Sequence, residues 1–162
     1  MKKKRVINVT PREQGFGISF NAMASPCEVL IETKDKLLAK KVGQAVANEV
    51  WRIEDKFSRY DANSVCSRIN TSKGQSIAID NETFLLLNFA DQCYQLSDGL
   101  FDITSGVLRQ VWRFDGSDKI PSQLTVSKVM KNVGWQKICF DENQITLPDL
   151  MEIDFGRDHK LF

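Results

Sequence analysis

The sequence has few of the residues on which most acid–base and metal sites depend. It contains one histidine, His159, and its cysteines lie far apart without a CxxC pair (Cys27, Cys66, Cys93 and Cys139). These features argue against a Ser-His-Asp triad, a histidine-rich metal centre, a zinc site and a dense disulfide framework. We interpret the cysteines as reduced core residues and His159 as a frayed terminal residue.

The sequence also lacks a marked excess of one charge, long apolar runs and glycine-rich phosphate loops. The 22 Lys and Arg residues nearly balance the 21 Asp and Glu residues, which leaves a formal net charge of +1. No overall field would draw the chain to nucleic acid or to an anionic membrane, so any binding must come from a local site. No stretch approaches the ~18 apolar residues of a membrane-spanning helix. Neither a Walker loop nor GxGxxG is present, so a nucleotide would have to be held by another device.

The N-terminus is basic but does not read as an export signal. The run MKKKRVINVTPREQGFG lacks the apolar region of ~7–15 residues that a signal peptide requires, and no lipid-attachment cysteine follows it. We therefore predict a disordered basic segment over residues 1–15 and a cytoplasmic chain. A length of 162 residues with 42% hydrophobic content predicts one domain core.

Strand and helix patterns alternate along the chain. GISFNAMASPCEVLIET predicts two short strands joined around residues 24–26, and SIAI and KICFDENQITL predict a further strand and a hairpin. Helices are expected over residues 36–57, 82–97, 105–112 and 126–133, and a closing strand over 150–155 is expected to lead into a turn at Gly156. The predicted fold class is α+β, an antiparallel sheet covered by two main helices.

The two main helices each carry apolar residues at three- and four-residue steps, which predicts one inward face per helix. For the first helix, which Asp35 can cap, the predicted face comprises Leu38, Val42, Val46, Val50, Ile53 and Phe57. For the second it comprises Phe84, Leu85, Phe89, Cys93 and Leu96.

Two loops carry candidate binding residues, each with two readings. FSRYDANSVCSRIN places Tyr60 among Arg, Asp, Ser and Asn side chains, a composition suited to a flat polar ligand, although Tyr60 could also pack over the edge of the core. In SDGLFDITSGVLRQVW, Asp102 could contact a ligand or simply cap the helix that follows. Composition alone leaves both alternatives open.

Four motifs in order resemble one known family. NAMASPCEV, EDKFSRYDANSVCSRIN, DGLFDITSGVLRQVW and MEIDFG are similar in sequence and spacing to the FAD:protein FMN transferase family, also called the ApbE or thiamine-biosynthesis lipoprotein family. The resemblance covers residues 16–156. It implies the N-terminal portion of an ApbE-like fold and a Mg²⁺-dependent enzyme that cleaves FAD, transfers FMN to a threonine hydroxyl of a target flavoprotein and releases AMP. Members of the family are often exported lipoproteins.

The resemblance also assigns cofactor-binding positions. Met23 lies where family members touch the flavin, and Tyr60 where an aromatic or polar group contacts FAD. Leu100, Phe101 and Asp102 match a segment that binds the cofactor through its backbone and a carboxylate. Asp154 matches the acidic residue of the family's glycine turn, and by register Lys160 matches the lysine of that turn.

The end of the chain departs from the family pattern. After DFG the family continues with a second glycine and a further half domain that holds the metal-binding Asp and Thr, whereas here Arg157, Asp158 and His159 follow. We therefore expect residues 16–156 to be a truncated domain, residues 157–162 to be an atypical tail, and the chain alone to be inactive as a transferase. The alternative is a non-catalytic remnant that binds FAD or AMP weakly, or that associates with another chain through an uncovered sheet edge.

Overall fold

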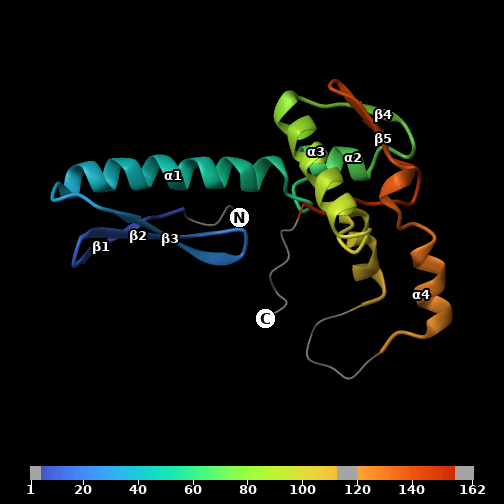
Figure 1. Cartoon of the computed structure of the whole chain (residues 1–162), viewed down its shortest axis with the longest axis horizontal. Helices are drawn as coiled ribbons and strands as arrows, with labels where there is room; N and C mark the ends of the chain where they lie inside the picture. Colours follow the sequence, from blue (N-terminus) through green and yellow to red (C-terminus); the bar gives the residue numbers. More distant parts are fainter. Residues whose placement is uncertain (1–4, 113–119, 156–162) are drawn as a thin grey trace. The chain divides into compact units, whose positions relative to one another are not determined.

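The computed structural model describes residues 5–112 and 120–155, which form two compact units. The first unit contains the described residues up to Lys56, and the second begins at Phe57. Figure 1 shows the elements of each unit, which are described separately below.

The first unit is a three-stranded antiparallel sheet with one long helix on it. Its strands β1 (Asn8–Arg12), β2 (Gly15–Ala22) and β3 (Ser25–Ile31) pair in the order β1-β2-β3, and α1 (Lys36–Lys56) packs against β2 (Figure 1). The hairpin predicted around residues 24–26 is present, with Ala22 opposite Ser25. Strand β1 lies within the segment predicted to be disordered, so that prediction is wrong for residues 8–12, whose backbone pairs with β2.

Helix α1 begins where the sequence predicts but buries a different face. The Asp35 carboxylate accepts hydrogen bonds from the backbone N–H groups of Leu37 and Leu38, at 2.8 and 3.1 Å. The buried residues are Ala39, Gly43, Ala47 and Trp51. Leu38 and Val42, from the predicted face, are 47% and 39% exposed.

Close packing of α1 on the sheet explains this shift of face. A Cβ atom at Gly43 would lie 2.6 Å from two side-chain carbons of Ile18, so only glycine allows the helix to approach β2 this closely. Trp51 completes the contact, because its indole N–H donates to the carbonyl of Asn21 at 2.9 Å and its ring meets that of Phe20 edge-on. Small residues therefore line the seam, and the larger apolar residues lie beside it.

The second unit combines a small sheet with several helical segments. Its sheet is antiparallel in the order β4-β6-β5. The elements are α2 (Val65–Asn70), β4 (Ser76–Ala78), α3 (Asn81–Leu96), the 3-10 helix η1 (Ile103–Gln110), α4 (Gln123–Met130), the 3-10 helix η2 (Trp135–Lys137), β5 (Cys139–Phe140) and β6 (Gln144–Thr146). The predicted hairpin forms as β5 and β6, whereas α2 was not predicted.

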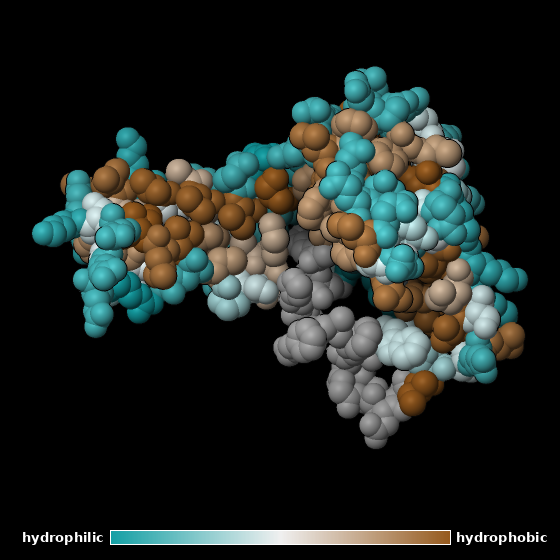
Figure 2. Space-filling view, viewed as in Figure 1, coloured by the Kyte–Doolittle hydropathy of each residue, from teal (hydrophilic) through white to brown (hydrophobic). Residues whose placement is uncertain are grey.

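Helix α3 also buries a face other than the predicted one. Its buried residues are Thr83, Leu87 and Ala90, of which Leu87 and Ala90 join the core that includes Ile69, Ile145 and Ile153. The larger apolar residues of the predicted face include three that are mostly exposed: Leu85 (57%), Phe89 (62%) and Leu96 (87%). Apolar side chains are visible on the face shown in Figure 2.

The α+β class with antiparallel sheets is confirmed, although the strands are divided between two three-stranded sheets. None of the helices in the described ranges is long and apolar enough to cross a membrane.

Candidate functional site

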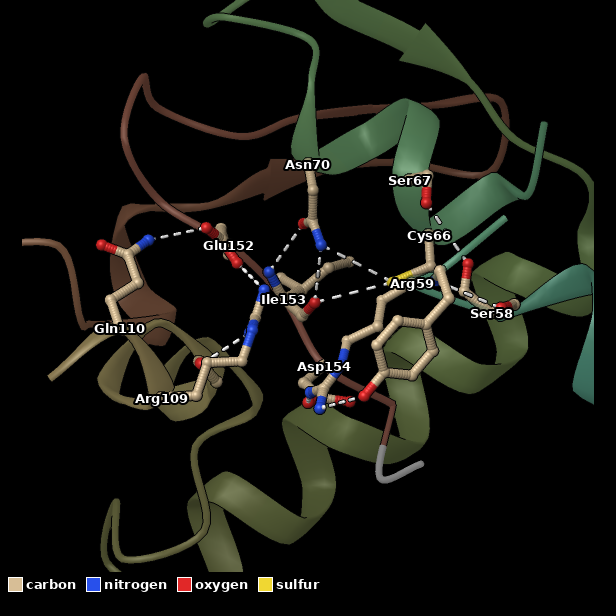
Figure 3. A network of polar contacts seen from close by, with 12 residues as sticks. Ser58, Arg59, Cys66, Ser67, Asn70, Arg109, Gln110, Glu152, Ile153 and Asp154 are labelled. Atoms are coloured by element: carbon tan, nitrogen blue, oxygen red, sulfur yellow. Dashed lines mark hydrogen bonds and ion pairs between the residues drawn. The ribbon is translucent and has the colours of Figure 1, made fainter. Parts of the chain in front are cut away.

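The segment from Met151 to Phe155 forms the centre of a polar network in the second unit (Figure 3). The sequence predicts a closing strand here, but the segment pairs with neither described sheet. The Asn70 side chain binds it instead: Oδ1 accepts the N–H of Ile153 at 2.8 Å, and Nδ2 donates to the carbonyl of Ile153 at 2.9 Å. The N–H of the following residue, Asp154, donates to the carbonyl of Ile103 at 2.9 Å.

Two arginines meet the carboxylates that flank Ile153. Arg59 forms an ion pair with Asp154, and the two side chains are only 7% and 17% exposed. Arg109 pairs with Glu152, which also accepts a hydrogen bond from Gln110 at 2.7 Å. Because Ile153 is fully buried, its neighbours on either side project away from the core toward the arginines.

Gly106 allows the helix η1 to lie directly against Asp154. A Cβ atom at position 106 would come within 2.6 Å of the Asp154 Cβ. The Gly106 carbonyl also accepts a hydrogen bond from Arg109 at 2.6 Å. A larger residue here would push η1 away from the carboxylate.

Burial and charge shift the acid–base behaviour of two groups in the network. Burial and the nearby charge of Arg59 lower the pKa of Arg109, but a guanidinium remains charged at neutral pH. Burial, with a smaller effect of Asp154, raises the pKa of the Cys66 thiol to about 12. Cys66 is therefore protonated at neutral pH and is not a nucleophile, in agreement with its interpretation as a reduced core residue.

Tyr60 lies beside the Arg59–Asp154 ion pair. Its hydroxyl accepts a hydrogen bond from Arg59 at 3.1 Å, and the guanidinium lies 5.1 Å from the centre of its ring. The Ser58 hydroxyl accepts the backbone N–H of Tyr60 at 3.2 Å, which shapes the turn. Tyr60 is 69% exposed, so it does not pack over the core edge, which was the other reading of this loop.

Asp102 caps η1, the commoner of its two predicted roles. One carboxylate oxygen accepts the N–H and the hydroxyl of Thr104, at 2.8 and 2.6 Å, and the other accepts the N–H of Trp135 at 3.1 Å. The preceding Leu100 and Phe101 are 92% and 48% exposed. Since Asp102 adjoins Ile103, whose carbonyl binds the Asp154 N–H, the Leu100–Asp102 loop lies next to the network.

Two predicted positions remain, Met23 and Lys160. Met23 belongs to the first unit, where its backbone N–H donates to the Glu54 carboxylate at 3.0 Å. Met23 and Ala24 form the two-residue β-hairpin loop with positive φ angles of 51° and 59°, a conformation that costs non-glycine residues free energy. Lys160 lies outside the described residues.

The network includes residues that sequence reasoning did not assign to the site. Arg59 and Asn70 are in the first candidate loop, so its polar composition carried a signal for them. Arg109 and Glu152 are 43 positions apart, and no local pattern links residues at that separation. Their pairing depends on the fold.

The donor set of the described residues does not fit the Mg²⁺ ion that the resemblance implies. Over residues 5–112 and 120–155, no group of three or more His, Cys, Asp or Glu side chains is placed to hold a metal ion. The Asp154 carboxylate pairs with Arg59, and that of Asp102 binds Thr104 and Trp135. Mg²⁺ prefers several oxygen ligands in octahedral array, which these carboxylates do not provide.

Comparison with solved structures identifies the fold. The chain is similar to the ApbE protein from Thermotoga maritima, with a TM-score of 0.75 and 24% identity over 94% of this chain and 48% of that one. It is also similar to the flavin transferase ApbE from Vibrio cholerae, with a TM-score of 0.66 and 17% identity over 93% of this chain and 48% of that one. The fold is thus that of ApbE flavin transferases.

Comparison of sequences gives the family. The ApbE family model matches residues 23–158, so the chain belongs to the ApbE family. The FAD:protein FMN transferase of Chlamydia muridarum is 29% identical over 131 residues, which are 79% of this chain and 42% of that protein. The enzyme of the same name from Chlamydia trachomatis is 35% identical over 100 residues, 60% of this chain and 32% of that protein. The chain therefore spans less than half the length of these curated relatives.

Proposed function

We propose that the chain acts in FAD:protein FMN transfer and that its second unit holds FAD at the network around Asp154. The observation that carries this proposal is the family match over residues 23–158, which includes the whole network. The curated relatives with this match are named FAD:protein FMN transferases. Charge-paired arginines beside an exposed aromatic ring are suited to a ligand that combines phosphates with flat ring systems.

The reaction that we propose is a phosphoryl transfer to a target flavoprotein. The oxygen of a threonine hydroxyl attacks the phosphorus of the FMN half of FAD, and the bond from that phosphorus to the bridging oxygen breaks. AMP leaves with the bridging oxygen, and the hydroxyl proton passes to solvent. Mg²⁺ is the metal expected for this reaction.

Individual residues of the second unit have distinct proposed roles. The Tyr60 ring packs against a flat part of FAD, and Arg59 and Asp154 orient the ligand through hydrogen bonds. The Leu100–Asp102 loop contributes backbone groups, because the Asp102 carboxylate is already bound to Thr104 and Trp135. By resemblance alone, Met23 in the first unit is a proposed flavin contact and Lys160 a proposed cofactor-binding residue.

Full activity requires metal ligands beyond those of the described residues, which lack a suitable cluster. The chain alone should therefore bind FAD but release little or no AMP from it. The test incubates the chain with FAD, Mg²⁺ and a threonine-bearing target flavoprotein, and measures AMP by chromatography and flavin on the target by in-gel fluorescence. A fusion of the chain to the unmatched half of the Chlamydia muridarum relative should release AMP and label the target. FMN transfer by the unmodified chain would show that it holds a complete site.

A second candidate function is a non-catalytic role through association with another copy. The exposed apolar residues of α3 favour it, since Leu85, Phe89 and Leu96 lie at helical spacing on one side. Its test is the oligomeric state of the chain in solution.

A further inference from the structure

We infer that Asn70 is a positioning residue, which sets the register of the segment that carries Glu152 and Asp154. This inference rests on the proposed function, because it assigns a task to Asn70 within the proposed FAD site. Asn70 touches none of the proposed ligand groups itself. Its effect would pass through Ile153 to Asp154 and Arg59.

The Asn70 amide binds both backbone polar groups of Ile153. Its oxygen accepts the Ile153 N–H at 2.8 Å, and its nitrogen donates to the Ile153 carbonyl at 2.9 Å. One side chain thus supplies both hydrogen bonds that a neighbouring strand would give to this residue. These bonds replace the sheet pairing that the segment lacks, and both are made to a single residue (Figure 3).

A slip of the 151–155 segment by one residue would change which of its side chains are buried. Successive side chains of an extended segment point to opposite sides, so a shift by one residue would exchange the buried and outward positions. Ile153 is fully buried, whereas Glu152 and Asp154 meet Arg109 and Arg59. A slipped segment would bury a carboxylate, and Asp154 would lose its ion pair with Arg59.

The other contacts of Ile153 cannot replace Asn70. Cys66 also donates to the Ile153 carbonyl, but at 3.6 Å and from a thiol, which is a weak donor. Two further backbone bonds of the segment join the Asp154 N–H to the carbonyl of Ile103, on the opposite side, and the Met151 N–H to the carbonyl of Pro148. Without Asn70, the Ile153 N–H would lose its partner, at the desolvation cost of a buried donor.

The test is equilibrium FAD binding, followed by flavin fluorescence, in the wild-type chain and in Asn70→Ala. We expect the dissociation constant for FAD to rise about tenfold, the order of change that the loss of one hydrogen-bond partner produces. Asn70→Asp is a second variant that keeps the size and the acceptor oxygen but loses the donor, and it should also weaken binding. Asn88→Ala is the matched control, because among the described residues the Asn88 amide donates only to the carbonyl of Phe84 in its own helix, at 3.2 Å.

A double-mutant cycle separates positioning from a general loss of stability. If Asn70 acts through Asp154, then Asn70→Ala should weaken FAD binding much less in an Asp154→Asn background than in the wild type. Hydrogen exchange at the Ile153 amide should accelerate in both Asn70 variants but not in Asn88→Ala. Binding is measured where circular dichroism shows each variant to be folded.

The outcomes distinguish this inference from the proposed function. If the wild type binds FAD and both Asn70 variants bind it equally well, the positioning role is wrong and the proposed function stands. If the effects of the Asn70 and Asp154 substitutions on FAD binding were additive, the role would also be wrong, because Asn70 would then not act through Asp154. If the wild type binds no FAD, the proposed function fails for this chain and the role fails with it. Unchanged exchange at Ile153 would by itself refute the register argument.

Discussion

Tyr60 is the exposed aromatic residue of the network, and its ring is the part of the proposed site best suited to stack on FAD. Base–aromatic stacking in nucleic-acid binders is worth about 1–3 kcal/mol per base, which sets the scale for a similar contact here. Tyr60→Ala should therefore weaken FAD binding by a factor of roughly 5 to 150. Isothermal titration would measure the change. Phe89→Ala, at an exposed aromatic residue of α3, is the control and should leave the affinity unaltered.

Cys66 makes a residue-scale prediction about alkaline pH. Burial raises the pKa of the folded-state thiol from 9.0 to about 12, so above pH 9 the unfolded chain releases this proton while the folded chain keeps it. The contribution of Cys66 to stability is therefore complete below pH 9 and is lost as the pH rises toward 12. Urea denaturation across this range should show a smaller alkaline loss of stability in Cys66→Ala than in the wild type. If the free energy of unfolding fell equally with pH in the two proteins, the buried-thiol account would be contradicted.

At the scale of elements, Gly43 shows how closely α1 lies on its sheet. Alanine normally favours a helix interior by about 1 kcal/mol over glycine, but here its Cβ would lie 2.6 Å from Ile18. Overpacking of this kind costs about 1–3 kcal/mol, so Gly43→Ala should lower the free energy of unfolding by roughly 1 kcal/mol. Thermal denaturation tests whether the variant is less stable than the wild type. Lys41→Ala, at an exposed position of α1, is the control. A stabilised Gly43→Ala variant would mean that the helix is not held this tightly.

The apolar residues of α3 that face outward predict self-association. Leu85, Phe89 and Leu96 are all more than half exposed, and burial against a second copy would remove this apolar area from water. Sedimentation velocity should show a concentration-dependent dimer that the double variant Leu85→Gln/Phe89→Gln reduces. Leu124→Gln, at an exposed leucine of α4, is the control. A wild-type chain that stays monomeric at all concentrations would contradict the prediction.

Several elements could be predicted from the sequence because their signals are local. Turn residues and caps, such as Asp35 before α1 and the Asp141–Asn143 turn between β5 and β6, act on their immediate neighbours. The buried helix faces could not be predicted in the same way. Large apolar residues dominate a periodic sequence pattern. Gly43 and Ala47 are buried because α1 lies close to the sheet, and that contact is not visible in the sequence of the helix.

In the candidate site, too, some residues could be predicted from local sequence and others meet only in the folded chain. Tyr60 and Asp154 both contact Arg59, and the capping role of Asp102 is one of the two roles that its sequence position offers. Arg109 and Glu152 meet only because η1 and the 151–155 segment fold against each other. The closing strand is predicted from alternation, but its backbone bonds at Ile153 and Asp154 are made to the side chains of Asn70 and Cys66 and to the carbonyl of Ile103. A strand without a sheet has no signature in its own sequence.

At the scale of the whole molecule, the central claim is that this chain, which matches less than half the length of its curated relatives, carries an FAD site. The most direct test is an equilibrium titration of the wild-type chain with FAD, beside the double variant Arg59→Ala/Tyr60→Ala. The account predicts saturable binding of one FAD per chain, and loss of most of that affinity in the double variant. Absence of saturable binding in the wild type, or equal binding by the two proteins, would contradict the account and place any flavin site elsewhere.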